Sequence, residues 1–400
     1  MSTNLPGQSR KYESITSQRV NQIPPSGIRR FFDLLASMEG VISLGIGEPD
    51  YPTPWHIREA AIHAIEKGYT MYTSNLGMPE LRQELSQHLK NSYNLDYDPN
   101  SQLLITIGVS EALDLVMRAL LNPGDEVIMP DPCYVSYPAC VVLAGGTPVM
   151  VPTYEKNNFE ISASDIEARV SDKTKIILIG YPANPTGAVM GKEKLLQIAE
   201  VARRHQLLVI YDEIYAKLVY GVKHTCFTTL PGMKERTILL SGFSKAYAMT
   251  GWRIGYAAAN KEIIAAMTKI HQYTLLCVPI MAQVAAIEAL KSGEASTTEM
   301  VNEYNRRRQV MVKGLNEIGL PCFEPRGAFY AFPSIKGTGM TSQEFSERLL
   351  LEEKVAVVPG TAFGRCGEGY VRCCYATSLA DIEEALSRMK RFVDKHKKEG

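Results

Sequence analysis

Polar and charged side chains that could do chemistry follow four of the apolar runs in this 400-residue chain. The runs, at 103–107, 175–180, 207–211 and 237–241, are short and continuous, which is typical of strands buried on both faces. Ligands of a parallel sheet bind beyond the carboxyl ends of its strands, where the residues after each run meet. The residues expected at that edge are Val109 and Ser110 in a glycine turn, Asn184, Asp212, Tyr215, Lys245 and Arg253.

This set of residues suits a phosphorylated cofactor that carries an aldehyde. A lysine can react with an aldehyde as a nucleophile, and a carboxylate can pair with a ring nitrogen. A glycine turn that leads into a helix presents free N–H groups to a phosphate. We therefore predict pyridoxal phosphate, for which Lys245, Asp212 and the turn at 108–110 would supply these contacts.

The motifs of competing enzyme classes are missing from the sequence. Gly45-Ile-Gly47-Glu-Pro-Asp50 begins like a dinucleotide-binding loop, but it lacks the third glycine and continues into Pro49. No G-x-x-x-x-G-K-[ST] occurs, and no G-x-S-x-G follows a predicted strand. Dinucleotide-dependent enzymes, P-loop NTPases and α/β-hydrolases are therefore disfavoured.

The elements that must hold these residues alternate between strand and helix from about residue 40 to 290. A further strand is predicted at 127–129, amphipathic helices at 112–121 and 192–205, and a capping-box helix start at Ser164-Asp-Ile-Glu167. This alternation predicts an α/β fold with a mostly parallel, doubly wound sheet. After about residue 295 the pattern changes to a smaller α+β domain, with helices at 303–318, 342–351 and 380–396 and strands at 328–332, 355–358 and 370–374.

We predict four parts along the chain. Residues 1–14 form a flexible tail, 15–45 an N-terminal segment that packs with the small domain, 46–295 the large cofactor-binding domain and 296–400 the small C-terminal domain. Within the second part, apolar residues at helical spacing predict a helix over 26–39 with Ser26 as its N-cap.

Charge and cysteine content limit the partners and the compartment. Lys plus Arg and Asp plus Glu each number 43, so the net charge is zero and nucleic acid, which favours a basic excess, is not an expected partner. Eight scattered cysteines without a C-x-x-C, and seven histidines never at H-x-x-x-H spacing, predict a reducing compartment and no metal site. The polar start and the lack of a long apolar run predict a cytoplasmic protein that does not enter a membrane.

Seven motifs, spread over most of the chain, occur in a characteristic order. They are SLGIGEPDYPTP (43–54), YTSNLGMPELR (72–82), NPTG (184–187), YDEIY (211–215), SGFSKAYAMTGWRIG (241–255), GAFYAF (327–332) and GEGYVRCCYA (367–376). In this order, over roughly residues 15–395, the chain resembles class I/II pyridoxal-phosphate-dependent aminotransferases of fold type I, and among them prokaryotic aspartate and aromatic aminotransferases. The resemblance implies a homodimer with shared active sites. It also implies a ping-pong transfer of the amino group from an L-amino acid, aspartate or aromatic, to a 2-oxo acid such as 2-oxoglutarate.

The resemblance further implies a role for each residue around the cofactor ring. Lys245 would hold the aldehyde as an imine and then move the proton between substrate and cofactor. Asp212 would pair with the pyridine nitrogen. Asn184 and Tyr215 would donate hydrogen bonds to the ring oxygen, and Tyr134 would stack on the ring.

The phosphate and the substrate would be bound by a second group of residues. The implied phosphate ligands are the Val109 and Ser110 amides, Arg253, a hydroxyl of Ser241 or Ser244, and Tyr72 of the neighbouring subunit. The implied substrate ligands are Gly45, Asn184 and Arg372, with Arg372 clamping the α-carboxylate through its planar guanidinium. The bond between Asn184 and Pro185 is expected to be cis.

The sequence also departs from the family, and alternatives stay open. Gly242 stands where many relatives have a serine, so either Ser241 or Ser244 would meet the phosphate. Ser110 or Glu111 stands where some aspartate-specific relatives carry a lysine, which weakens the case for acidic substrates. A C–S lyase of the same fold would release ammonia and pyruvate instead. A non-catalytic, aminotransferase-like ligand-sensing domain is the third reading, and the presence of Lys245 and Asp212 disfavours it.

Overall fold

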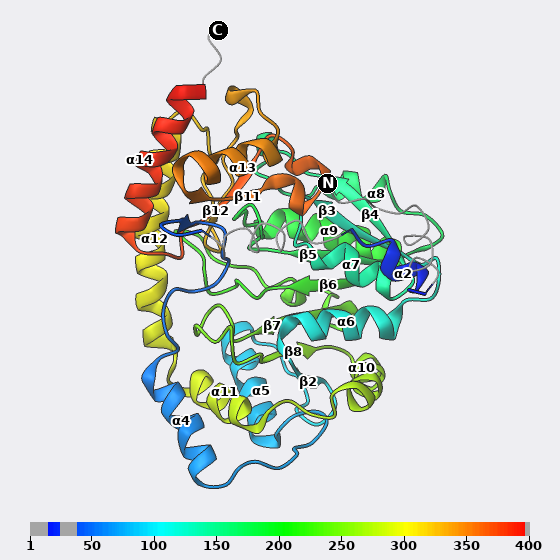
Figure 1. The fold of residues 1–400 in the computed structure, drawn as a ribbon. Helices are drawn as coiled ribbons and strands as arrows, with labels where there is room; N and C mark the ends of the chain where they lie inside the picture. The colour runs from blue at the N-terminus through cyan, green and yellow to red at the C-terminus, as the bar shows by residue number, and fades with distance from the viewer. Residues whose placement is uncertain (1–14, 25–37, 397–400) are drawn as a thin grey trace.

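The computed structural model describes residues 15–24 and 38–396. Within these residues, a seven-stranded sheet forms the centre of the molecule, in the order β2, β8, β7, β6, β5, β3, β4 (Figure 1). Its strands are β2 (Leu103–Thr106), β3 (Glu126–Asp131), β4 (Thr147–Pro152), β5 (Thr174–Gly180), β6 (Leu208–Asp212), β7 (Thr237–Gly242) and β8 (Gly255–Ala258). Neighbouring strands are parallel except at β8, which is antiparallel to both β2 and β7. The predicted α/β fold with a mostly parallel sheet is confirmed.

The sheet is buried on both faces because alternate side chains of each strand meet different helices. In β5, Ile176 and Leu178 belong to one apolar cluster with α6 (Gly108–Leu120) and α10 (Lys261–Thr274). Ile177 and Ile179 belong to another, with α5 (Pro79–Tyr93), α9 (Lys192–Arg204) and α11 (Ile280–Ser292). Helix α4 (Trp55–Glu66) packs against α11.

The C-terminal part packs around its own apolar cluster. The long helix α12 (Glu294–Glu317) lies beside α14 (Leu379–His396), and α13 (Ser342–Glu353) contacts α14 (Figure 1). The strands are β9 (Tyr330–Ala331), β10 (Val355–Ala356), β11 (Val358–Pro359) and β12 (Val371–Cys374). β12 is antiparallel to both β9 and β11, and β1 (Ile42–Ser43) runs parallel to β10. The predicted smaller α+β unit is therefore present.

The N-terminal segment is described in two pieces, 15–24 and 38–45, which contact different parts of the molecule. Helix α2 (Gln18–Asn21) contacts α7 (Ser136–Leu143), and Arg19 Nη1 donates a hydrogen bond to Leu143 O at 3.3 Å. A cation is favoured there because the last carbonyls of a helix carry partial negative charge. Residues 38–45 instead contact the C-terminal part, where β1 pairs with β10 and Met38 and Val41 pack against Leu350 and Ala356. That the whole segment 15–45 packs with the small domain remains a prediction. The predicted tail at 1–14, and Ser26 with most of the helix predicted at 26–39, lie outside the described residues.

Most predicted elements are found, and the misses have local causes. The sequence TPVMVP of β4 contains two prolines and GYAA of β8 is small and short, so neither shows a long apolar run. The helix predicted from Ser164 begins earlier, because Ser162 caps α8 (Ala163–Glu167) by accepting the Asp165 N–H at 3.1 Å. The predicted boundary between the large and the small domain at residue 295 remains a prediction.

None of the described helices combines the length and apolar character that a membrane span requires.

Candidate functional site

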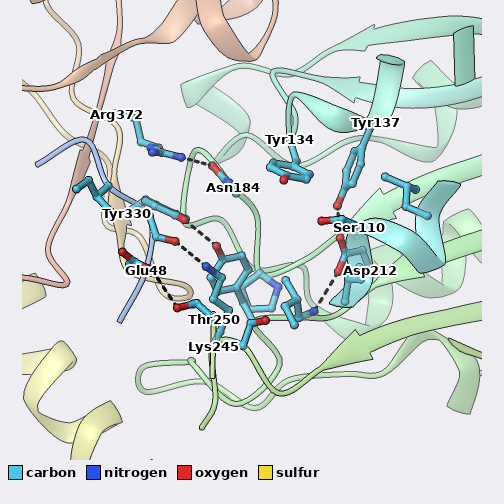
Figure 2. A pocket seen from close by; sticks show the side chains of 18 of the residues that line it. Glu48, Ser110, Tyr134, Tyr137, Asn184, Asp212, Lys245, Thr250, Tyr330 and Arg372 are labelled. Atoms are coloured by element: carbon cyan, nitrogen blue, oxygen red, sulfur yellow. Dashed lines mark hydrogen bonds between the residues drawn. The ribbon is translucent and has the colours of Figure 1, made fainter. Parts of the chain in front are cut away.

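A cavity of about 440 Å³ lies where the carboxyl ends of β5, β6 and β7 face loops from the C-terminal part. Figure 2 shows how Lys245, Asp212, Asn184 and Arg372 surround this cavity. The predicted site residues that line it are Gly45, Val109, Ser110, Tyr134, Asn184, Asp212, Tyr215, Ser244, Lys245, Arg253 and Arg372. Residues far apart in the sequence therefore meet at one edge of the sheet, as the topology of parallel strands predicts.

Lys245 follows β7 in the turn at 243–250, and its amine is buried in the cavity wall. Its Nζ donates a hydrogen bond to Gly47 O at 2.6 Å and lies 5.8 Å from the centre of the Tyr215 ring. Burial disfavours the ammonium form and lowers the pKa of Lys245 to about 8, although Cys374 and Glu48 oppose this effect. More of this amine is neutral near physiological pH than in an ordinary lysine, and a neutral amine can act as a nucleophile or base.

Asp212 ends β6 and is 6% exposed. Its Oδ2 accepts a hydrogen bond from the Tyr137 hydroxyl at 2.8 Å, and its Oδ1 accepts one from the Ile214 N–H at 3.1 Å. Burial raises the pKa of Asp212 to about 6, and these two hydrogen bonds oppose part of the shift. No lysine, arginine or histidine of the described chain forms an ion pair with this carboxylate. A buried carboxylate without a cation is costly, so the cavity suits a ligand that brings a positive charge to Asp212.

The turn at the start of α6 combines two features that attract an anion. Helix α6 begins at Gly108 and no side chain caps it, so its first N–H groups are available and its positive dipole end faces the cavity. Gly108 has φ +69°, and a Cβ there would lie 2.8 Å from Arg253 Nη2. Arg253 donates to Thr250 O at 2.9 Å and has no acidic partner among the described residues. Free amides beside an unpaired guanidinium favour a phosphate group.

Arg372, on β12, lies on the side of the cavity formed by the C-terminal part. Its Nη1 donates to Asn184 Oδ1 at 3.0 Å, and its Nη2 donates to Gly45 O at 2.7 Å. Its guanidinium lies 4.4 Å from the centre of the Tyr330 ring and 4.8 Å from that of Phe363. Its Nε is buried without a hydrogen-bond partner in the described chain. A rigid, incompletely paired guanidinium of this kind suits the carboxylate of a substrate.

Aromatic side chains complete the walls. The Tyr215 and Tyr330 hydroxyls are 2.7 Å apart and share a hydrogen bond. A Cβ on Gly47 would lie 2.4 Å from the Tyr330 hydroxyl, so a larger residue there would displace the Tyr330 ring. The Tyr134 ring packs edge-on against Tyr137, with 5.6 Å between their centres. The peptide bond from Asn184 to Pro185 is cis, as predicted.

Two predicted site residues lie outside the cavity lining. Ser241 donates a hydrogen bond to Glu213 O at 3.4 Å and faces a separate small cavity of about 30 Å³. Neighbouring side chains of a strand point to opposite faces of the sheet. The presence of a serine in the motif therefore did not show on which face of β7 its hydroxyl lies. Tyr72 is 83% exposed at the surface of the single chain.

Some residues of the cavity were missed in the sequence. Tyr137 lies three residues after Tyr134 at the start of α7, but its partner Asp212 comes from a strand 75 positions away. Glu48 Oε2 accepts a hydrogen bond from Thr250 Oγ1 at 3.0 Å, and both residues line the cavity. The sequence signal for Glu48 and Thr250 was their place inside the motifs at 43–54 and 241–255, and that for Tyr137 was its closeness to Tyr134.

Comparison with known proteins gives consistent results. The family model for aminotransferase class I and II matches residues 39–389. A putative aminotransferase of Bacillus subtilis, YugH, is 57% identical over 96% of this chain and 99% of its own length. A Pyrococcus abyssi protein named aspartate aminotransferase is 48% identical over 95% of this chain and 99% of its own length. The crystal structure of an aromatic aminotransferase from Pyrococcus horikoshii is 46% identical, covers 91% of this chain and 99% of that chain, and superposes with a TM-score of 0.88.

Proposed function

Because the chain belongs to the aminotransferase class I and II family and is an aminotransferase, we propose that it uses pyridoxal phosphate as its cofactor. The proposed reaction moves the amino group of aspartate or an aromatic L-amino acid to a 2-oxo acid such as 2-oxoglutarate. One observation carries this proposal: Lys245, Asp212 and Arg372 line the same cavity. An amine, a carboxylate and a guanidinium are the groups that amino-group transfer on a pyridine cofactor needs. The names of the relatives support the two substrate classes.

The residues present fit pyridoxal phosphate. The buried Asp212 carboxylate lacks a cation among the described residues, and the pyridinium nitrogen of the cofactor would supply one. The open start of α6 and the guanidinium of Arg253 would hold the phosphate dianion. Ser244 lines the cavity and Ser241 does not, so Ser244 is the serine we propose for the phosphate.

The proposed chemistry divides among the side chains. The bound cofactor supplies an aldehyde that reacts with amines and a protonated ring that accepts electrons from the substrate Cα. Lys245 Nζ is the base that takes the Cα proton and later returns a proton, and its lowered pKa makes the neutral amine available. Asp212 keeps the ring nitrogen protonated. Tyr215, Asn184 and Tyr134 line the cavity, where the first two would donate hydrogen bonds to the ring oxygen and Tyr134 would pack on the ring.

The proposed function is tested by following the amino nitrogen. We expect the purified protein, supplied with pyridoxal phosphate, to form labelled glutamate from 2-oxoglutarate and nitrogen-labelled aspartate, tyrosine or phenylalanine. Mass spectrometry of the products measures this transfer. No labelled glutamate from these donors, together with release of pyruvate, ammonia and homocysteine when cystathionine is supplied instead, would contradict it and favour the C–S lyase.

Replacing Arg372 with alanine is expected to raise KM for every amino acid and oxo acid, because all of them carry the α-carboxylate. Removing one partner of a buried, hydrogen-bonded charge pair costs about 2–5 kcal/mol. Arg372→Lys should recover little, because a lysine cannot bond to Asn184 and Gly45 while packing flat on Tyr330. Steady-state kinetics with several donors measures the effect, and Arg326→Ala, at an arginine outside the cavity, is the matched control. An increase in KM for one substrate only would argue against the clamp.

We propose that the active molecule is a homodimer. Exposed apolar side chains gather on the loop at 69–76 and at the end of α10, where Met71, Tyr72 and Tyr273 are 77%, 83% and 85% exposed. The two segments are neighbours, because Asn75 Nδ2 donates to Leu276 O at 2.7 Å. An exposed apolar patch of this kind favours a protein interface. Sedimentation equilibrium should give twice the chain mass of 44.4 kDa, and Tyr273→Asp should shift it toward one chain mass. A wild-type monomer would contradict the dimer.

We also propose the cytoplasm as the compartment. All eight cysteines are unpaired, and unpaired cysteines are typical of a reducing compartment. Cell fractionation tests this, and recovery of the protein outside the cytoplasm would contradict it.

A further inference from the structure

The end of β3 is tied to the turn that follows β11. Asp131 Oδ1 accepts a hydrogen bond from the Cys366 N–H at 3.2 Å, and the Cys133 N–H donates to Phe363 O at 2.9 Å. Asp131 is itself fixed, because its backbone carbonyl accepts the Thr153 N–H at 2.8 Å and the Thr153 hydroxyl at 3.1 Å. These contacts cross from the central sheet to the C-terminal part. A rigid strand end therefore holds the turn at 360–367 in place.

The carboxylate of Asp131 touches the backbone of this turn closely. Asp131 is 5% exposed, and its Oδ1 contacts the Cys366 N–H directly at 3.2 Å. Gly364 has φ +136°, and a Cβ there would lie 1.9 Å from Asp131 Oδ1. Only a glycine allows the turn to approach this far. Gly364 directly follows Phe363. The Asp131 carboxylate, which contacts the backbone at Gly364, therefore also restricts where the Phe363 ring can lie.

Phe363 in turn packs on Arg372. Its ring centre lies 4.8 Å from the guanidinium, which also contacts the Tyr330 ring at 4.4 Å. The two Nη atoms of Arg372 already bond to Asn184 and Gly45, and its Nε has no partner among the described residues. The guanidinium is thus oriented by two hydrogen bonds and by aromatic rings rather than by an acidic side chain. Movement of the Phe363 ring would tilt the plane that must meet the substrate carboxylate.

We propose that Asp131 is a positioning residue for substrate binding: its carboxylate anchors the 364–366 turn and thereby keeps Phe363 against the Arg372 guanidinium. This inference rests on the proposed function, because it concerns the α-carboxylate that Arg372 binds. Asp131 does not line the cavity, so its effect on the substrate passes through the turn. A residue that acts in this way affects binding of all substrates more than the chemical step.

The test compares Asp131→Asn and Asp131→Ala with the wild-type enzyme. The amide of the Asn variant can still accept the Cys366 N–H, whereas alanine leaves this N–H without its acceptor. We expect KM for both the donor and the oxo acid to rise about tenfold in the Ala variant, less in the Asn variant, with a smaller change in kcat. Asp125→Ala is the matched control, because Asp125 precedes the same strand at its other end and pairs with Lys175 at 3.1 Å. It should leave KM unchanged.

Two further measurements separate positioning from a general loss of stability. The dissociation constant of 2-methylaspartate, which has no α-hydrogen to lose, should rise in parallel with KM while the thermal midpoint changes little. In combination with Phe363→Leu, Asp131→Ala should add little further loss, because both act through one ring. Unchanged KM in a folded Asp131→Ala variant would overturn the proposal, and so would effects that multiply in the double variant. If the proposed function itself fails, the wild-type enzyme shows no amino-group transfer, which is a different result.

Discussion

Replacing Lys245 with alanine is expected to abolish amino-group transfer while the protein still folds and still binds pyridoxal phosphate. Lys245 Nζ is the proposed proton carrier at the substrate Cα, and it is the amine with which the aldehyde reacts. The loss of a positioned acid–base group alone lowers a rate by about 10²–10⁴-fold, and we expect the effect on kcat to reach at least the upper end of this range. Single-turnover kinetics with aspartate measures it, and equilibrium dialysis measures the retained cofactor.

The matched control for this variant is Lys245→Arg. An arginine keeps the positive charge and much of the volume, but its pKa is too high for it to act as a base near neutral pH. Both variants should therefore be inactive, although the Arg variant preserves the local charge next to Gly47. Turnover near the wild-type rate in either variant would contradict the assignment of Lys245.

Replacing Asp212 with alanine is expected to weaken cofactor binding and to slow the chemical step together. The buried carboxylate is the proposed partner of the ring nitrogen, and loss of one member of such a pair costs about 2–5 kcal/mol. The dissociation constant for pyridoxal phosphate should therefore rise about 30-fold or more. Quenching of protein fluorescence gives this constant, and single-turnover kinetics gives the rate. Wild-type affinity in the variant would contradict the role of Asp212.

The raised pKa of Asp212 adds a pH dependence to this prediction. The pKa is about 6, so the free carboxylate gains a proton and loses its charge as the pH falls below that value. Affinity for the cofactor should fall over the same interval. The phosphate group titrates near pH 6 as well, and Asp212→Asn separates the two effects because it keeps the phosphate and the hydrogen bond from Tyr137. The part of the pH dependence that disappears in the Asn variant belongs to Asp212.

Much of the site could be predicted because strands carry a strong sequence signal. Continuous apolar runs identified β2, β5, β6 and β7, and the rule that parallel strands bind ligands at their carboxyl ends then collected Asn184, Asp212 and Lys245 at one edge. The ends of the predicted strands were enough to bring these three residues together, without the positions of individual side chains. The order of seven motifs added Arg372, which lies on β12 of the C-terminal part and could not be placed by the sheet alone.

The residues that were missed depend on tertiary contacts. Tyr137 became part of the site only through its hydrogen bond to Asp212, and Glu48 and Thr250 through the hydrogen bond between them. Ser241 was placed with the phosphate by its position in the motif, yet its hydroxyl faces Glu213 O on the other side of β7. Alternation along a strand decides this orientation, and a one-residue difference reverses it.

The measurement that tests the central claim most directly is the visible absorption of the protein loaded with pyridoxal phosphate, titrated with one amino acid at a time. Aspartate, tyrosine or phenylalanine alone should bleach the band of the bound cofactor in a single turnover, and 2-oxoglutarate should then restore it while glutamate is released. This cycle requires Lys245, Asp212 and Arg372 to act on one ligand in one cavity. A band that none of these amino acids bleaches, or release of pyruvate and ammonia from cystathionine by a protein that leaves these three amino acids unchanged, would contradict the account.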